Sequence, residues 1–248
     1  GRSAFQTVLN KISFGLFFKD DVNVGVTAKD DSSGVKSVMY YESGSVLSED
    51  EVLAITDWTE KSDFDIEASD NDKFVVYVRI EDNAGNVRFI GSDGAIFDTE
   101  SPKIVGVENG KTYYVTKKVA VDDENLESVT LNGTPASEVF TLGGDTDATY
   151  NICAKDKAGN VTEYTVFMKP ISSVTDAVSG ITKDNVKSSD ADTVLAVERL
   201  IFDIAESFDD GVSTDAEWNK LTKASAKCKE LSKRIADVAD EIARLTDG

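Results

Sequence analysis

The sequence is poor in the residues on which most enzymes and metal sites depend. Its 248 residues include no histidine, two cysteines and three prolines. The lack of histidine excludes Ser/His and Cys/His nucleophilic pairs and the usual zinc hydrolases. Cys153 and Cys228 lie 75 positions apart, which is no metal-ligand spacing. We expect both to be small buried residues; a structural disulfide between domains is the alternative.

The sequence also has no long hydrophobic run and little positive charge. No stretch of 18 apolar residues occurs, so no transmembrane helix is predicted, and no secretion signal or sorting tail is visible. Lys and Arg total 26 against 46 Asp and Glu, a net charge of −20. Such a field repels phosphate, so we expect no nucleic-acid partner. The lack of a long apolar run predicts no membrane insertion in this fragment. The simplest interpretation of this net negative charge is that it keeps the protein soluble.

Tryptophan is also scarce, with two residues in the chain. Paired carboxylates for glycoside hydrolysis need a sugar-binding cleft, and no Trp/Tyr-rich pattern accompanies the acidic residues. The sequence therefore predicts a protein that is not an enzyme and that needs no cofactor.

A repeat organises what is present. Residues 76–88 read VYVRIEDNAGNVR and residues 150–162 read YNICAKDKAGNVT, 74 positions later. In each copy an alternating strand runs into Asp-x-Ala-Gly-Asn-Val, a turn followed by a return strand. The repeat predicts two copies of one small β domain.

The flanking sequence places the boundaries of these two domains. Residues 1–100 form the first domain. Apolar residues alternate strictly from Val22 to Ala28, which predicts a strand with one face buried, and Ser48 with Glu51 opens an inserted helix. A short helical lead precedes it, because apolar residues recur at helical spacing at Phe5, Val8, Leu9 and Ile12. Pro102 marks the joint, since proline cannot continue a strand ladder. Residues 101–170 form the second, smaller domain.

After Pro170 the apolar period changes from two to 3.6. Three amphipathic stripes follow, and the last is opened by a second capping box at Thr214 and Glu217. Residues 171–248 therefore predict a three-helix bundle. The expected fold class is multidomain β plus α: two antiparallel β-sandwiches followed by three helices.

The Asp-x-Ala-Gly-Asn turns and the Asp98–Pro102 joint resemble the bacterial Ig-like repeats of Gram-positive cell-surface proteins, over roughly residues 12–170. This resemblance implies Ig-like sandwiches and a location on the bacterial cell surface. Residues 171–248 are similar in helix number and size to the modules with which such proteins bind host immunoglobulin or albumin. Immunoglobulin is therefore the first partner expected.

Two sets of residues are candidates for binding. Asp82, Asn86, Asp98 and Glu100 offer oxygen ligands for a structural calcium ion, although Asp and Asn also cap tight turns through their own backbone. Trp218 with the basic strip Lys220, Lys223, Lys227 and Arg234 is the candidate protein-binding surface. The structural alternatives are that Trp218 caps the end of the bundle and that the basic strip is a solvated helix face.

The sequence thus predicts a non-catalytic cell-surface protein whose Ig-like modules form a stalk and whose helices bind a host protein. Two alternatives stay open. The chain is a purely structural stalk, or it is an accessory region of a large carbohydrate-active enzyme.

Overall fold

The computed structural model describes residues 14–143, 147–208 and 211–246. The chain divides into two compact units. The first comprises Gly1–Pro102 with Asp123–Glu127 and Lys155–Val161, and the second comprises Lys103–Asp122, Ser128–Ala154 and Thr162–Gly248. The helical lead predicted around Phe5 lies outside the described residues.

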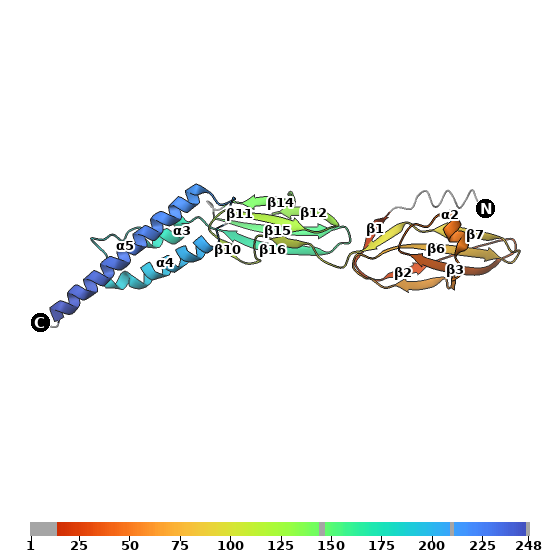
Figure 1. Cartoon of the computed structure of the whole chain (residues 1–248), viewed down its shortest axis with the longest axis horizontal. Coiled ribbons are helices and arrows are strands. Elements are labelled where there is room, and N and C mark those ends of the chain that lie inside the picture. Colours follow the sequence, from red (N-terminus) through yellow and green to blue (C-terminus); the bar gives the residue numbers. More distant parts are fainter. Residues whose placement is uncertain (1–13, 144–146, 209–210, 247–248) are drawn as a thin grey trace. The chain divides into compact units, whose positions relative to one another are not determined.

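Residues 14–97 of the first unit form two sheets of unequal size (Figure 1). The larger has the order β1-β8-β6-β3-β4, with β7 also paired to β6, and the smaller is the pair β2-β5. Only β1 and β8 run parallel; the other pairs are antiparallel. The elements are β1 (Phe14–Phe18), β2 (Val22–Gly25), β3 (Val35–Ser43), α2 (Glu49–Ala54), β4 (Thr59–Glu60), β5 (Asp63–Ile66), β6 (Lys73–Asp82), β7 (Val87–Gly91) and β8 (Gly94–Phe97).

Strand β6 is buried on both faces, which explains its unbroken apolar run. Phe74 and Val76 face the smaller sheet and pack in one cluster with Phe64 of β5. Val75 and Tyr77 face the other way and pack with Val52 of α2. The predicted capping box opens this helix, since Ser48 accepts a hydrogen bond from the Glu51 backbone and the Glu51 side chain accepts one from Ser48. The inserted helix thus covers the outer face of β6.

The second repeat copy also forms two sheets, which together are β-sandwich-like. Their orders are β10-β16-β15-β12-β13 and β14-β11-β9. Val119 and Val121 of β11 and Ile152 and Ala154 of β15 are all buried, so both sheets contribute to the core. The elements are β9 (Lys103–Val105), β10 (Thr112–Tyr113), β11 (Lys117–Asp122), β12 (Leu126–Leu131), β13 (Thr134–Pro135), β14 (Val139–Leu142), β15 (Ala148–Asp156) and β16 (Val161–Met168).

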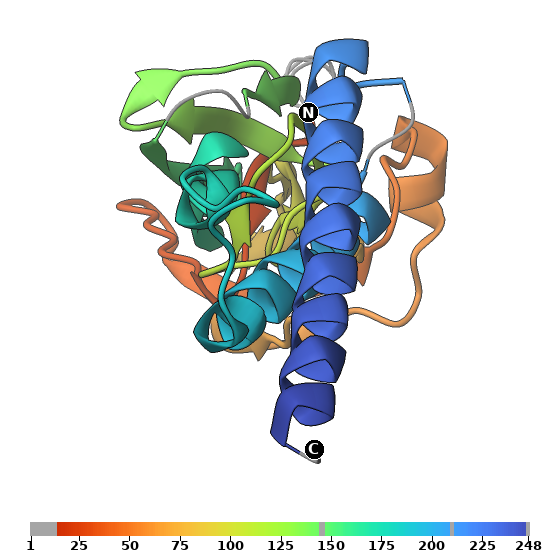
Figure 2. The same cartoon turned by 90° about the vertical axis from the view of Figure 1, so that its left-hand side faces the viewer.

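A helical region follows Pro170, but it differs from three full helices. Two long helices are present, α4 (Ala191–Glu206) and α5 (Asp215–Thr246), and they lie side by side (Figures 1 and 2). The first predicted helix is reduced to short turns: α3 (Ser172–Thr175) and η1 (Asp176–Val178), with η2 (Ser188–Asp190) before α4. Its apolar stripe is still buried, at Ile171, Val174 and Val178. Neither α3 nor η1 has a side-chain cap, and Gly180 disfavours continuation.

Both cysteines are free thiols, but only Cys228 is buried as the sequence predicted. Cys228 is fully buried in the helical core and Cys153 is half-buried in β15. Burial raises the pKa of each thiol above its ordinary value. Among the described residues, no helix is both long and apolar enough to cross a bilayer.

Replacing Gly106 with alanine should destabilise the second unit. Gly106 has φ +93°, and a Cβ built there would lie 2.0 Å from the backbone oxygen of Lys118. Gly110 is the matched control, because its φ is +79° but a Cβ there meets nothing within 4 Å. We expect Gly110→Ala to cost about 1 kcal/mol of unfolding free energy and Gly106→Ala at least about 2 kcal/mol. Urea denaturation followed by circular dichroism measures both; equal losses would contradict the steric argument.

Candidate functional site

The site is built on the first turn of α5, which a buried carboxylate fixes. The predicted capping box is present: Thr214 backbone and hydroxyl donate to Oε2 of Glu217 at 2.7 and 3.2 Å, and the Glu217 N–H donates to Thr214 Oγ1 at 3.2 Å. Capping residues of this kind are usually exposed, yet Glu217 is only 2% exposed. Its burial needs further partners.

Those partners come from the loop before β11. Thr116 donates its backbone N–H and its hydroxyl to Oε1 of Glu217, at 2.8 and 2.9 Å. In return, the Ser213 hydroxyl donates to the Thr116 carbonyl at 3.1 Å. Nearby, Lys117 Nζ donates to the backbone oxygen of Ser207 at 3.0 Å. Both carboxylate oxygens are therefore satisfied, and α5 is tied to the β structure of its own unit.

The apolar core of the helical region continues this junction. Val115, in the same loop, is completely buried and belongs to one cluster with the inward faces of α4 and α5. On α4 that face is Val194, Val197, Ile201 and Ile204. The positions of α4 and α5 are thus set by a polar network and by hydrophobic contacts together.

Two large aromatic side chains stand outside this core. Phe202 of α4 is 65% exposed and Trp218 of α5 is 46% exposed. They border a groove of about 270 Å³ between the two helices, whose other lining residues include Ile201, Ala205 and Leu221. Trp218 is held in an edge-on contact with Phe208, with ring centroids 5.2 Å apart. We call this surface, with Phe202 and Trp218 at its rim, the aromatic groove.

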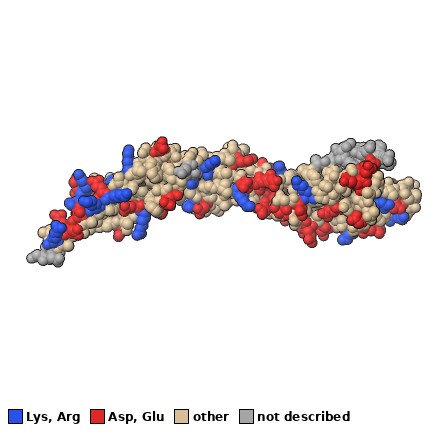
Figure 3. Space-filling view, in the orientation of Figure 1, with Lys and Arg blue, Asp and Glu red and all other residues tan. Residues whose placement is uncertain are grey.

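The basic strip lies on the other flank of α5. At about 100° per residue, Lys220, Lys223, Lys227 and Arg234 lie roughly 140–180° around the helix from Trp218. The three lysines line a separate groove beside α3 and η1, where Lys227 Nζ donates to the Ser179 carbonyl at 3.0 Å. Figure 3 shows Lys and Arg gathered over the helical region. The structure therefore does not bring Trp218 and the basic strip into one surface.

The two repeat turns have the geometry of self-capped turns. Asp82 accepts from the Asn86 backbone and side chain at 2.8 and 2.7 Å, and Asp156 accepts the same pair of bonds from Asn160 at 2.9 and 2.7 Å. These bonds lower the pKa of Asp82, the Asn86 side chain being the largest cause. Asp82 and Asn86 thus act on their own backbone.

Asp98 lies instead in a cluster of carboxylates within the first unit. Oxygens of Asp98, Asp123 and Asp156 lie within 4.8 Å of one another, and Asp98 and Asp156 are buried. Burial raises the pKa of Asp98, and the charges of Asp156 and Asp70 raise it further, against a hydrogen bond from Asn125. Three hard oxygen donors at this spacing are a ligand set for a cation such as Ca²⁺. Glu100 contributes its backbone carbonyl to Asn160 at 3.1 Å.

Sequence reasoning missed two residues of these sites, Asp123 and Phe202. Asp123 lies in the turn before β12, which occupies the place of the Asp30–Gly34 turn before β3 in the first copy. Aligning the two repeats therefore gave a signal for it. Phe202 follows the buried Ile201, and its exposure could have been found because it falls outside the apolar stripe of α4.

Comparisons with known proteins find no matching family model and no matching curated protein. Solved structures show weak similarity. Fibronectin(III)-like modules of Clostridium thermocellum CbhA align over 64% of this chain and 92% of their own, at 10% identity and a TM-score of 0.32. Bacteroides ovatus SGBP-B, in complex with a mixed-linkage heptasaccharide, aligns over 62% of this chain and 43% of its own, at 14% identity and a TM-score of 0.24. The human desmocollin-1 ectodomain aligns over 64% of this chain and 34% of its own, at 14% identity and a TM-score of 0.23.

The chain spans less than half the length of the last two structures. At these scores the similarities carry no information on activity, ligand or partner.

Removing the Glu217 carboxylate should loosen α5 from its unit. We expect Glu217→Ala to lower the free energy of unfolding by about 3 kcal/mol, because four partly buried hydrogen bonds from Thr116 and Thr214 lose their acceptor, and Glu217→Gln to lose less. Urea denaturation measures both variants. Glu230→Ala, at an exposed position of the same helix, is the control. A loss below about 0.5 kcal/mol for Glu217→Ala would show that the network does not stabilise the junction.

Substituting Asp98 should give a pH-dependent change in stability. A raised pKa means that the native state holds its proton more tightly than the unfolded chain, so ionised Asp98 destabilises the fold at neutral pH. Asp98→Asn should therefore be most favourable, relative to the unaltered chain, at pH 7, and the difference should shrink as the pH falls through the pKa of Asp98.

Chemical denaturation at pH 7, 5.5 and 4 in a chelator measures this difference. Repeating it with millimolar Ca²⁺ tests the cation site, because a bound cation would make Asp98→Asn destabilising at pH 7. A difference that does not vary with pH would contradict the assignment of Asp98.

Proposed function

We propose that this chain is a non-catalytic part of a bacterial cell-surface protein and that it binds a host protein through the aromatic groove. In this proposal the β-sandwich-like domains are Ig-like modules that act as a stalk. The two long helices, with α3 and η1 as the remnant of a third, are the binding element. The proposal places the protein outside the cell.

The observation that carries the proposal is the pair of exposed aromatics on a preorganised helical surface. Trp218 and Phe202 expose a large part of their rings to water, although the residue that precedes each of them, Glu217 and Ile201, is buried. Binding hot spots are enriched in tryptophan, and they lie in pockets from which a partner excludes water. A groove set between two packed helices costs little conformational entropy on binding.

Immunoglobulin is the first partner we would test, and albumin the second. The support is the resemblance of the sequence to Gram-positive surface proteins, together with the helical surface. The wide separation of Trp218 from the basic strip on α5 makes the aromatic groove, and not the strip, the surface assigned to this role.

A stalk without a protein partner is the second candidate function. The observation that favours it is the Glu217–Thr116 network, which joins the helical region to the β structure of the same unit. A spacer needs such a firm junction between successive elements, and it needs no exposed hot spot.

Binding of the full 248-residue chain to immobilised immunoglobulin and albumin distinguishes the two functions. We expect saturable binding to one of them, with Trp218→Ala and Phe202→Ala each raising Kd at least about ten-fold. Lys223→Ala, on the other flank of α5, is the matched control and should leave Kd within about two-fold. Absence of binding to both proteins would favour the spacer, and loss of binding through Lys223→Ala alone would move the site to the basic strip.

A further inference from the structure

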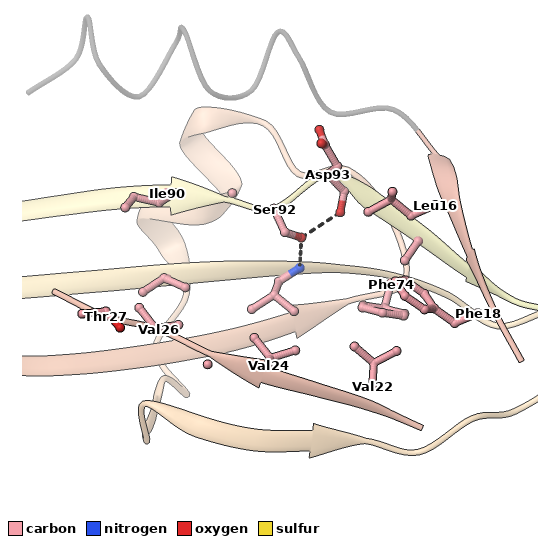
Figure 4. A pocket seen from close by; sticks show the side chains of 15 residues that line it. Leu16, Phe18, Val22, Val24, Val26, Thr27, Phe74, Ile90, Ser92 and Asp93 are labelled. Atoms are coloured by element: carbon pink, nitrogen blue, oxygen red, sulfur yellow. Dashed lines mark hydrogen bonds between the residues drawn. The ribbon is translucent and has the colours of Figure 1, made fainter. Parts of the chain in front are cut away.

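The groove beside α3 and η1 differs in chemistry from the apolar cleft of the first unit. That cleft, beside β2, is lined mainly by aliphatic and aromatic side chains, and its Ser92 hydroxyl already accepts the Val76 N–H and donates to the Asp93 carbonyl (Figure 4). The groove beside α3 has a volume of about 480 Å³, and its lining combines three lysines with three hydroxyl side chains. We call it the lysine groove, and these six residues are Ser172, Thr175, Ser179, Lys220, Lys223 and Lys227.

The helical period brings the three lysines to one flank of α5. Positions 220, 223 and 227 are related as i, i+3 and i+7, so they lie within about 60° around the helix and about 10 Å along it. The Lys227 ammonium is held at the groove, because its Nζ donates to the Ser179 carbonyl at 3.0 Å. Lys223 is exposed and makes no ion pair or hydrogen bond with any described residue. Its ammonium is therefore available to a ligand.

The lysine groove holds positive charge without a facing negative charge. None of the described residues that line it is Asp or Glu, although the chain has 46 acidic residues against 26 basic ones. At physiological ionic strength the Debye length is about 8 Å, so exposed acidic groups beyond that distance are largely screened. The lysines therefore set the potential inside the groove, and an anionic ligand is compatible with the net charge of the chain.

The lining favours phosphate over carboxylate. A lysine ammonium is a compact point charge that suits a phosphate oxygen, whereas planar carboxylates are best matched by the fork of arginine. No arginine is among the described lining residues. Ser172 adds a hydroxyl that forms no hydrogen bond with a described residue, so it can donate to a phosphate oxygen.

The lysine groove has no surface that would read a nucleic-acid base. Its described lining contains no aromatic side chain on which a base would stack. The two apolar lining residues, Ile171 and Ala224, are aliphatic and buried, and they can contact the methylene groups of a ligand. A ligand of this groove is therefore recognised by its charges, and the links between those charges are aliphatic.

We propose that the lysine groove binds a phosphodiester polymer with aliphatic polyol spacers, which runs along α5 so that successive phosphates meet Lys223 and its neighbours Lys220 and Lys227. The aromatic groove lies on the other flank of α5. Binding of the polymer is therefore independent of the function proposed for that surface.

Calorimetric titration of the full 248-residue chain with soluble poly(glycerol phosphate), in about 50 mM salt, tests the proposal. The groove variant is Lys223→Gln with Lys227→Gln. The matched control, Lys61→Gln with Lys73→Gln, removes the same charge from exposed positions of the first unit. Lys223→Arg with Lys227→Arg keeps the charge in the groove, and melting temperatures show that each variant is folded.

We expect the groove variant to raise Kd at least about ten-fold, and the first-unit control and the arginine variant to leave Kd within about three-fold. Each neutralised phosphate contributes about −0.7 to the slope of log K against log salt concentration. The slope should therefore be about −2 for the unaltered chain and about −0.7 for the groove variant.

Absence of binding would overturn the proposal, and so would an equal loss of affinity in the first-unit control. Polygalacturonate, a carboxylate polymer, and single-stranded DNA should both bind more weakly than poly(glycerol phosphate); equal or tighter binding of either would overturn the assignment of the ligand. Vesicles of phosphatidylglycerol present a phosphodiester as a lipid headgroup. Binding to these vesicles without binding to the soluble polymer would also overturn it.

Discussion

The helical region depends on one carboxylate that has been taken out of water. Glu217 would be expensive to bury alone, and four donors from Thr116 and Thr214 make its burial favourable. One side chain therefore begins α5, fixes its direction and joins it to the loop before β11. Phe202 and Trp218 can remain exposed at a defined separation because the helices that carry them are held by this junction and by the core around Val115.

The repeat turns apply the same principle at a smaller scale. In both copies an aspartate accepts hydrogen bonds from an asparagine four residues later, so the turn satisfies itself without a ligand. The second copy differs in where its aspartate lies. Asp156 is buried against Asp98 and Asp123, so a residue that closes a turn also enters a carboxylate cluster in which the pKa of Asp98 is raised.

Much of this architecture could be predicted from the sequence, because it is recorded in local patterns. The alternation of Val22 and Val24, the two Asp-x-Ala-Gly-Asn turns and the capping boxes at Ser48 and Thr214 each act over a few residues. The rest depends on contacts between distant residues. The capping box gave no sign that Glu217 also accepts bonds from Thr116, 101 positions away. The stripe at Ile171, Val174 and Val178 showed which side chains are buried, but not that the helix carrying them is so short.

The candidate site was predictable only in part, for the same reason. Trp218 was singled out by residue type, and its separation from the basic strip could have been read from the helical period of 100° per residue. Only the structure shows that Trp218 lies at the groove beside α4 and that the lysines lie beside α3 and η1. Phe202 became a candidate only when its neighbour α5 was in place.

Oxidative footprinting of the full chain, free and saturated with immunoglobulin, tests the central claim most directly, because hydroxyl radicals report the exposure of individual aromatic side chains. The account predicts that Trp218 and Phe202 are oxidised in the free chain and protected together in the complex, while Leu53 on α2 reacts equally in both. Equal oxidation of Trp218 and Phe202 in the free and saturated chain would contradict the assignment of the aromatic groove as the binding surface.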